Sequence, residues 1–187
     1  MIKRLVLRTL EKWRTRQSRR IPYTELSAKH LKNLRNITDR ETLLEHLPKE
    51  AVVAEVGVLN GDFSAEIWIK AHPKTLHLID TWSGKEGAKN LERVKKRFHL
   101  EILEGRIILH QGSSTEVLKQ FQPGTFDWLY LDTDHAYETT AAELQLSAKI
   151  LKSNGLILGH DYVSGNWNSG VRYGVVEAVN EFCAQQH

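Results

Sequence analysis

The chain has 187 residues, of which 41% are hydrophobic and 26% charged, a balance that suits one packed core of ordinary size and argues against a disordered chain. Four prolines and twelve glycines exclude a collagen-like chain, and the single cysteine, Cys183, excludes an internal disulfide framework and fits a reducing compartment. Because no apolar run reaches the roughly 18 residues of a membrane span, and because the N-terminus lacks the pattern of a signal peptide, we expect a soluble cytoplasmic protein without integral membrane contact.

The net charge of +3 combines two unequal parts. Residues 1–20 carry eight Lys and Arg side chains against one acid, Glu11, which gives +7 and leaves −4 for residues 21–187. Apolar residues recur every three or four positions between Ile2 and Trp13, so we expect a basic amphipathic helix. We favour packing of this helix on the domain or on a second subunit, and keep contact with RNA or an acidic membrane as the alternative.

Residues 24–48 have the pattern of further helix. Thr38 is the expected N-cap, because Glu41 follows it at the spacing of a capping box. Pro48 is expected to end this helical part.

Short apolar segments alternate with amphipathic ones from residue 50 onward. We expect strands at 51–58, 76–79, 107–109, 126–131 and 156–158, and helices at 62–71, 85–100, 114–121, 136–151 and 171–185. This alternation predicts a doubly wound, mostly parallel α/β sheet of Rossmann type, with ligands at the carboxyl ends of its strands. We therefore expect an N-terminal helical part, residues 1–49, and a ligand-binding domain, residues 50–187.

Polar residues follow the first two strands. Gly57 and Gly61 allow a tight turn that a ligand can approach, and their G-x-x-x-G spacing differs from the dinucleotide fingerprint. Asp62 at the start of the next helix would repel a pyrophosphate, which favours a cationic or zwitterionic ligand. Asp80 ends the second strand, where an acid commonly accepts the hydroxyl groups of a ribose; a helix cap is the alternative. Trp82, two residues further, could form an aromatic wall for a base.

The later strand ends carry small polar and titratable side chains. Gln111-Gly112-Ser113-Ser114 could border an adenine or cap the next helix. Two further groups of acids and histidines follow the fourth and fifth strands, and these are Asp132, Asp134 and His135, then His160 and Asp161. Carboxylates and imidazoles on neighbouring strand ends indicate acid–base or metal chemistry.

Four motifs together resemble the class I S-adenosylmethionine-dependent methyltransferases. They are E-V-G-x-x-x-G-x-F-S, L-I-D-T-W, F-D-W-L-Y-L-D-x-D-H-x-Y and L-K-x-x-G-L-I-L-G-H-D-Y. Over residues 50–185 the chain is most similar to the branch of macrocin O-methyltransferase-like enzymes, which act on sugars and other natural products, and more distantly to catechol-type O-methyltransferases.

The resemblance implies roles for individual residues. Cofactor contacts are implied for Glu55, Gly57, Gly61, Asp80, Thr81, Trp82, Gly112, Ser113 and Asp132. A divalent cation, magnesium or manganese, would be held by Asp132, His160 and Asp161, and His135 would be the catalytic base beside Asp132.

Two departures from the family qualify these expectations. His160 stands where relatives present Asp or Glu, so manganese, iron or zinc would suit the site at least as well as magnesium, and a site without a metal is the alternative. The family continues into a final strand pair beyond the helix at 171–185, where this sequence ends. Either the chain is trimmed there or the sheet edge is completed another way, for example by a second subunit, and an open edge would favour a homo-oligomer.

An activated methyl on sulfur requires a positioned and deprotonated nucleophile. We therefore expect O-methylation of a small-molecule acceptor, with His135 as base; a structural turn in which its ring bonds Asp132 is the alternative. A glycine-rich loop, residues 163–173, with Trp167 and Arg172, could form an acceptor lid or a plain connection. The competing functions are a nicotinamide oxidoreductase, which G-x-x-x-G disfavours, and an RNA- or membrane-directed methyltransferase, with nucleic acid the less favoured partner.

Overall fold

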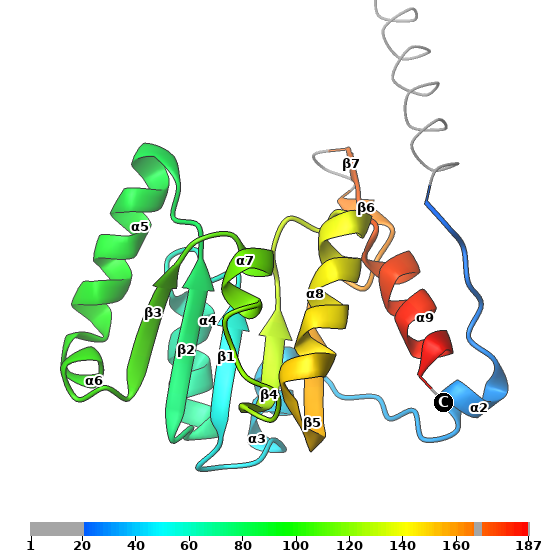
Figure 1. The fold of residues 1–187 in the computed structure, drawn as a ribbon, viewed down its shortest axis with the longest axis horizontal. Coiled ribbons are helices and arrows are strands. Elements are labelled where there is room, and N and C mark those ends of the chain that lie inside the picture. The colour runs from blue at the N-terminus through cyan, green and yellow to red at the C-terminus, as the bar shows by residue number, and fades with distance from the viewer. Residues whose placement is uncertain (1–20, 167–169, 187) are drawn as a thin grey trace, which may run out of the picture. The chain divides into compact units, whose positions relative to one another are not determined.

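The computed structural model describes residues 21–166 and 170–186 (Figure 1). The expected basic helix in residues 1–20 and the lid residue Trp167 therefore lie outside the described part. No helix among the described residues is both long and apolar enough to cross a membrane.

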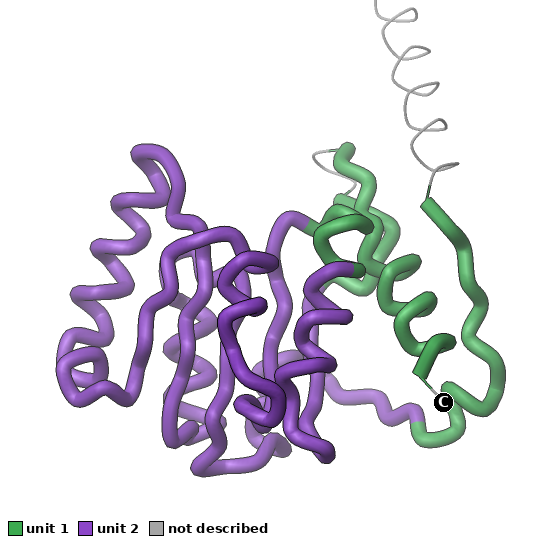
Figure 2. The backbone as a smooth tube through the Cα atoms, viewed as in Figure 1, with its two compact units in different colours: residues 1–33, 135–141, 161–187 green, residues 34–134, 142–160 purple. Residues whose placement is uncertain are grey.

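The chain forms two compact units (Figure 2). The sheet unit consists of residues 34–134 and 142–160, and the terminal unit consists of residues 1–33, 135–141 and 161–187. This grouping follows contacts in space and does not test the expected sequence boundary between residues 49 and 50.

Five parallel strands form the sheet in the order β3-β2-β1-β4-β5, which confirms the predicted doubly wound α/β fold (Figure 1). They are β1 Val52–Val56, β2 Thr75–Asp80, β3 Ile107–Gln111, β4 Phe126–Leu131 and β5 Leu151–Gly159. Because the chain moves outward from β1 to β3 and then returns to place β4 beside β1, the strand order switches between β1 and β4. In open α/β sheets, ligands bind at such a switch, outside the carboxyl ends of the strands.

Helices cover both faces of this sheet. In chain order they are α3 Arg40–Glu45, α4 Asp62–Glu66 with the π-helical turn η1 Ile67–Ala71, α5 Gly84–Arg97, α6 His99–Leu103, α7 Ser114–Leu118 and α8 Tyr137–Ile150. Figure 1 shows α4 behind the sheet and α7 in front of it.

The two sheet faces differ in character. One face buries an aliphatic core in which Val53 and Leu76 pack with Leu44 of α3, Ile67 of η1 and Val94 of α5. His77 of β2 and His110 of β3 point to the other face. Their rings pack there with those of Phe121 and Phe126.

The expected helix within 24–48 is instead two short helices, α2 Ala28–Leu31 and α3. Asp39 caps α3 in place of the predicted Thr38, since its Oδ1 accepts the Thr42 N–H at 2.7 Å. An N-cap side chain accepts the N–H of the residue two or three positions later. Asp39 stands three residues before Thr42, so the cap lies one residue later than predicted.

The last predicted helix also begins later than expected. The first residues of the helix expected at 171–185 form the strand β7 Val171–Arg172, which pairs antiparallel with β6 Gly165–Asn166. The helix α9 therefore runs over Val175–Gln185. The expected loop at 163–173 is thus partly a hairpin.

Candidate cofactor and active site

The turns after β1 and β4 pack backbone against backbone at the switch in strand order. Gly57 N–H donates to the Ile79 carbonyl at 2.9 Å, and Asp132 N–H donates to the Val56 carbonyl at 2.8 Å. Gly57 has a φ of +94°, and a Cβ built there would lie 1.9 Å from the Asp132 carbonyl oxygen. Only glycine fits this junction, which brings the first predicted glycine next to the first predicted metal ligand.

The carboxylate of Asp80 holds the glycine turn in place. Its Oδ2 accepts the N–H groups of Val58 and Leu59, each at 2.9 Å, and its Oδ1 accepts the N–H of Trp82 at 2.8 Å. The exposed Thr81 hydroxyl makes a longer contact with Oδ1 at 3.4 Å. Because a carboxylate oxygen has two acceptor positions, a ribose hydroxyl that reached Oδ1 would replace the Thr81 hydroxyl.

The side chain of Trp82 is hydrogen-bonded to the glycine turn after β1. Its side chain is buried, 3% exposed, and its indole Nε1 donates to the Leu59 carbonyl at 2.9 Å. The indole belongs to the hydrophobic core cluster, and its role as an aromatic wall for a base stays a prediction.

The end of β3 lies beside the end of β2. Gly112 N–H donates to the Asp80 carbonyl at 3.0 Å, and the Ser113 side chain accepts the Glu116 N–H at 3.4 Å as the N-cap of α7. Ser113 thus has the cap role that we had kept as the alternative, at a position next to the expected ribose acceptor.

Glu55 is a buried acid on β1, 2% exposed, with the Ser64 hydroxyl as its hydrogen-bond partner. Burial raises the pKa of Glu55 to about 8; the Ser64 hydrogen bond opposes this rise, and the nearby charge of Asp132 adds to it. At neutral pH the group is therefore mainly protonated and uncharged.

The second glycine of the turn is anchored by an arginine. Gly61 is the N-cap of α4, with a φ of +79°, and its carbonyl accepts Nη1 of Arg97 at 2.7 Å. The same guanidinium pairs with Asp62 at 2.6 Å and holds the pKa of that carboxyl below its usual value. The negative charge of Asp62 is therefore largely compensated.

Arg40 is a site residue that the sequence motifs did not reveal. Its guanidinium stacks on the Phe63 ring, with 4.2 Å from Cζ to the ring centroid, and its Nη1 lies 3.9 Å from Asp132 Oδ2. No motif includes Arg40, because it precedes β1 in the chain and reaches the strand ends only through the packing of α3.

Asp132 and His160 come together at the ends of β4 and β5. His160 N–H donates to the Leu131 carbonyl at 3.1 Å, and its Nδ1 lies 3.8 Å from Asp132 Oδ2. A carboxylate oxygen beside an imidazole nitrogen is a mixed donor set, which suits manganese, iron or zinc at least as well as magnesium.

Within the terminal unit, His135 and Asp161 form a close pair. His135 Nε2 lies 2.7 Å from Asp161 Oδ2, and the Tyr173 ring stacks on the imidazole with 4.5 Å between centroids. Both members of the pair have a left-handed backbone, with φ values of +61° for His135 and +56° for Asp161. Strained conformations of non-glycine residues concentrate at functional sites. The pair has the arrangement of an imidazole base oriented by a carboxylate.

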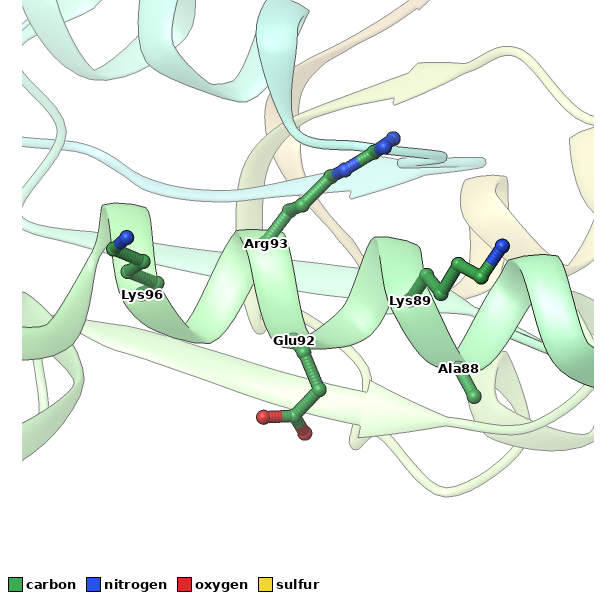
Figure 3. A pocket seen from close by; sticks show the side chains of 5 residues that line it. All are labelled: Ala88, Lys89, Glu92, Arg93 and Lys96. Atoms are coloured by element: carbon green, nitrogen blue, oxygen red, sulfur yellow. The ribbon is translucent and has the colours of Figure 1, made fainter.

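Two other features take no part in these clusters. The expected lid residue Arg172 forms an ion pair with Glu177. Its Nη1 also donates to the Ser164 carbonyl at 3.0 Å. A surface pocket along α5 is lined only by side chains of that helix, Ala88, Lys89, Glu92, Arg93 and Lys96 (Figure 3), and contains none of the predicted site residues.

Comparisons with known proteins give a family match and a curated relative. The family described as "Methyltransferase domain" matches residues 54–162, more than half of the chain. A curated relative, the O-methyltransferase ankF of Aspergillus thermomutatus, is 30% identical over 111 residues. This match covers 59% of the chain but only 45% of the relative, so the chain spans less than half of that protein.

Solved structures of low sequence identity share the fold. A putative rRNA-methylase from Clostridium thermocellum has a TM-score of 0.62 at 16% identity, with 82% of this chain and 83% of that one covered. The spermidine synthase of Thermotoga maritima has a TM-score of 0.51 at 17% identity, with 75% of this chain and 46% of that one covered.

Proposed function

This chain belongs to the methyltransferase-domain family, and from that premise we propose that it transfers the methyl group of S-adenosylmethionine to a hydroxyl group of a small molecule, a sugar or another natural product. The observation that carries the O-methylation proposal is the 2.7 Å pair of His135 and Asp161. The name of the curated relative, an O-methyltransferase, supports the same reaction class. The expected homo-oligomer and the cytoplasmic location stay predictions.

The residues of the sheet unit fit the chemistry of the cofactor. Asp80 would accept the ribose hydroxyls, Gly112 and Ser113 would border the adenine, and Glu55 with the glycine turn would line the methionine part. The bound cofactor supplies a methyl group that its positive sulfur has already activated. The protein must therefore position the acceptor oxygen and remove its proton.

His135 is the proposed base for that proton. A neutral imidazole that donates from Nε2 to the Asp161 carboxylate carries its lone pair on Nδ1, so Nδ1 would take the proton of the acceptor hydroxyl. Asp161 would hold the ring in this tautomer and stabilise the imidazolium that forms. General-base help of this kind contributes roughly 10²- to 10⁴-fold in rate.

A divalent cation is a further part of the proposal. Asp132 and His160, both in the sheet unit, would hold it, and it would lower the pKa of an acceptor hydroxyl as a Lewis acid. The histidine makes manganese at least as suitable as magnesium. Asp161, the third expected ligand, belongs to the terminal unit and stays a prediction.

A methyl-transfer assay with labelled S-adenosylmethionine and a panel of sugars and phenolic natural products tests the proposal. We expect His135→Gln to lower kcat by about 10²- to 10⁴-fold and to leave the affinity for S-adenosylhomocysteine unchanged, because the base acts on the acceptor. Full activity of this variant would remove His135 from the reaction, and failure of the wild type to bind S-adenosylhomocysteine would remove the cofactor assignment.

Chelation tests the cation. If it takes part, we expect EDTA to abolish transfer and added Mn²⁺ or Mg²⁺ to restore it. Activity that survives EDTA would remove the cation from the proposal, and a loss of activity in Asp161→Asn would then be assigned to the orientation of His135.

A further inference from the structure

Arg40 brings a permanent positive charge to the strand ends of the sheet unit. It lies in the first turn of α3, and its guanidinium reaches both Asp132 at the end of β4 and Phe63 in the first turn of α4. These contacts place the guanidinium beside the helix that begins at the glycine turn, close to Glu55, whose pKa its charge lowers in part.

Two carboxylates stand at the same strand ends as Arg40. Asp80 ends β2 and Asp132 directly follows β4, whereas Glu55 of β1 is mainly protonated at neutral pH. Such a site suits the ammonium and the sulfonium of S-adenosylmethionine, but it would repel the carboxylate of the same methionine moiety. A cation in this region is needed to reverse that repulsion.

The contacts of Arg40 also fit it for binding an anion. The ring of Phe63 fixes the guanidinium plane. The 3.9 Å separation from Asp132 is an ion pair that is longer than a hydrogen bond, and Nε is used by Glu41 at 3.3 Å. The side chain is 36% exposed, so part of it is open to a ligand, and the Tyr130 side chain of β4 is a further neighbour of the guanidinium. Parallel N–H donors of a guanidinium match the two oxygens of a carboxylate.

We infer that Arg40 binds the α-carboxylate of the methionine moiety and thereby selects a carboxylated cofactor over its decarboxylated analogue. This inference rests on the proposed function, because it assigns one contact within the same cofactor site.

Two thioethers that differ only in that carboxylate test the inference. S-adenosylhomocysteine carries it, and S-adenosyl-3-thiopropylamine lacks it while keeping the amine and the adenosine. We expect Arg40→Met, which keeps an apolar stem over Phe63, to weaken the first ligand by about 10- to 100-fold in titration calorimetry and to leave the second unchanged. Arg40→Lys, which keeps the charge but not the fork, is expected to fall between the wild type and Arg40→Met.

Arg106 provides a matched control. Its guanidinium likewise covers an aromatic ring, that of Trp68 at 4.9 Å, and pairs with Glu104, but it precedes β3 at the opposite end of the strands. Arg106→Met should therefore bind both thioethers as the wild type does. Equal weakening of both ligands in Arg40→Met, or an unchanged affinity for S-adenosylhomocysteine, would overturn the inference. Failure of the wild type to bind either thioether would instead reject the proposed function itself.

Discussion

The carboxylate of Asp80 has two tasks in the proposed site. It accepts three backbone N–H groups, from Val58, Leu59 and Trp82, and it is also the proposed acceptor for the ribose hydroxyls. A single side chain thus holds the glycine turn and is the proposed ligand contact beside it. Replacement of Asp80 by alanine should therefore lower both the free energy of unfolding and the affinity for the cofactor. Replacement by asparagine, which removes only the charge, should lower the two quantities to different degrees.

We expect Asp80→Ala to lower the free energy of unfolding by about 1–3 kcal/mol, because backbone donors lose their acceptor, and to weaken S-adenosylhomocysteine by about tenfold or more. Asp80→Asn keeps one side-chain oxygen as an acceptor, so it should recover part of the stability but little of the affinity. Urea unfolding and titration calorimetry on the three proteins measure both quantities. Undiminished affinity in Asp80→Ala would show that the ribose lies elsewhere.

Residues at strand ends were predictable from sequence, and residues that approach from elsewhere were not. Gly57, Asp80 and Asp132 follow a positional rule of parallel sheets, so their neighbourhood could be inferred without coordinates. Arg40 reaches the site by packing of a short helix, which no local pattern encodes. Trp82 was found at the right turn, but its burial depends on contacts distant in sequence.

At the scale of elements, the junction of β1 and β4 depends on one missing side chain. The Gly57 Cα faces the Asp132 carbonyl so closely that any Cβ would push the two strand ends apart. Because these are the central strands of the sheet and flank the switch in strand order, such a displacement affects the core and the site together.

Gly57→Ala should therefore cost about 3–5 kcal/mol of unfolding free energy, the sum of a left-handed alanine and an overpacked backbone junction. Gly124→Ala is the matched control, since Gly124 also has a positive φ, +75°, but a Cβ there would meet nothing within 4 Å. It should cost only about 1–2 kcal/mol. Urea unfolding of the two variants compares them, and equal losses would mean that the β1–β4 contact relaxes without cost.

The central strands were predicted closely for a physical reason, whereas the edge strand β5 begins at Leu151, five residues before the expected 156–158. A buried central strand such as Phe126–Leu131 is a continuous apolar run, which sequence shows directly. The break within 24–48 and the hairpin β6–β7 arise from caps and two-residue pairings, whose local signals are weak. The periodicity of residues 24–48 therefore favoured one helix, whereas Asp39 caps the start of a second helix, α3.

At the scale of the whole molecule, two buried groups make stability depend on pH in opposite directions. Glu55 has an ordinary pKa of 4.5 when unfolded, and burial raises it to about 8 in the folded chain. The contribution of Glu55 to the free energy of unfolding is therefore fully present below pH 4.5 and is lost as the pH rises through 8. His77 has an ordinary pKa of 6.5, and burial, with the neighbouring His110, lowers it to about 4. Its contribution is present above pH 6.5 and is lost as the pH falls through 4.

These shifts predict that the stability of the protein without cofactor is nearly constant between pH 4.5 and 6.5, where the two opposite slopes cancel, and falls above pH 6.5. Between pH 6.5 and 8 the neutral histidines no longer matter, so the fall in stability should come from Glu55, with a slope that approaches about 1.4 kcal/mol per pH unit. Glu55→Gln should flatten this alkaline limb, because a neutral amide does not titrate. His77→Phe should extend the Glu55-dependent fall down to about pH 4.5, because the compensating slope of His77 is gone. Urea unfolding at half-unit steps from pH 4.5 to 8 measures the level range and the alkaline limb. An alkaline fall of unchanged slope in Glu55→Gln would mean that Glu55 ionises in the folded chain without penalty and is charged at neutral pH.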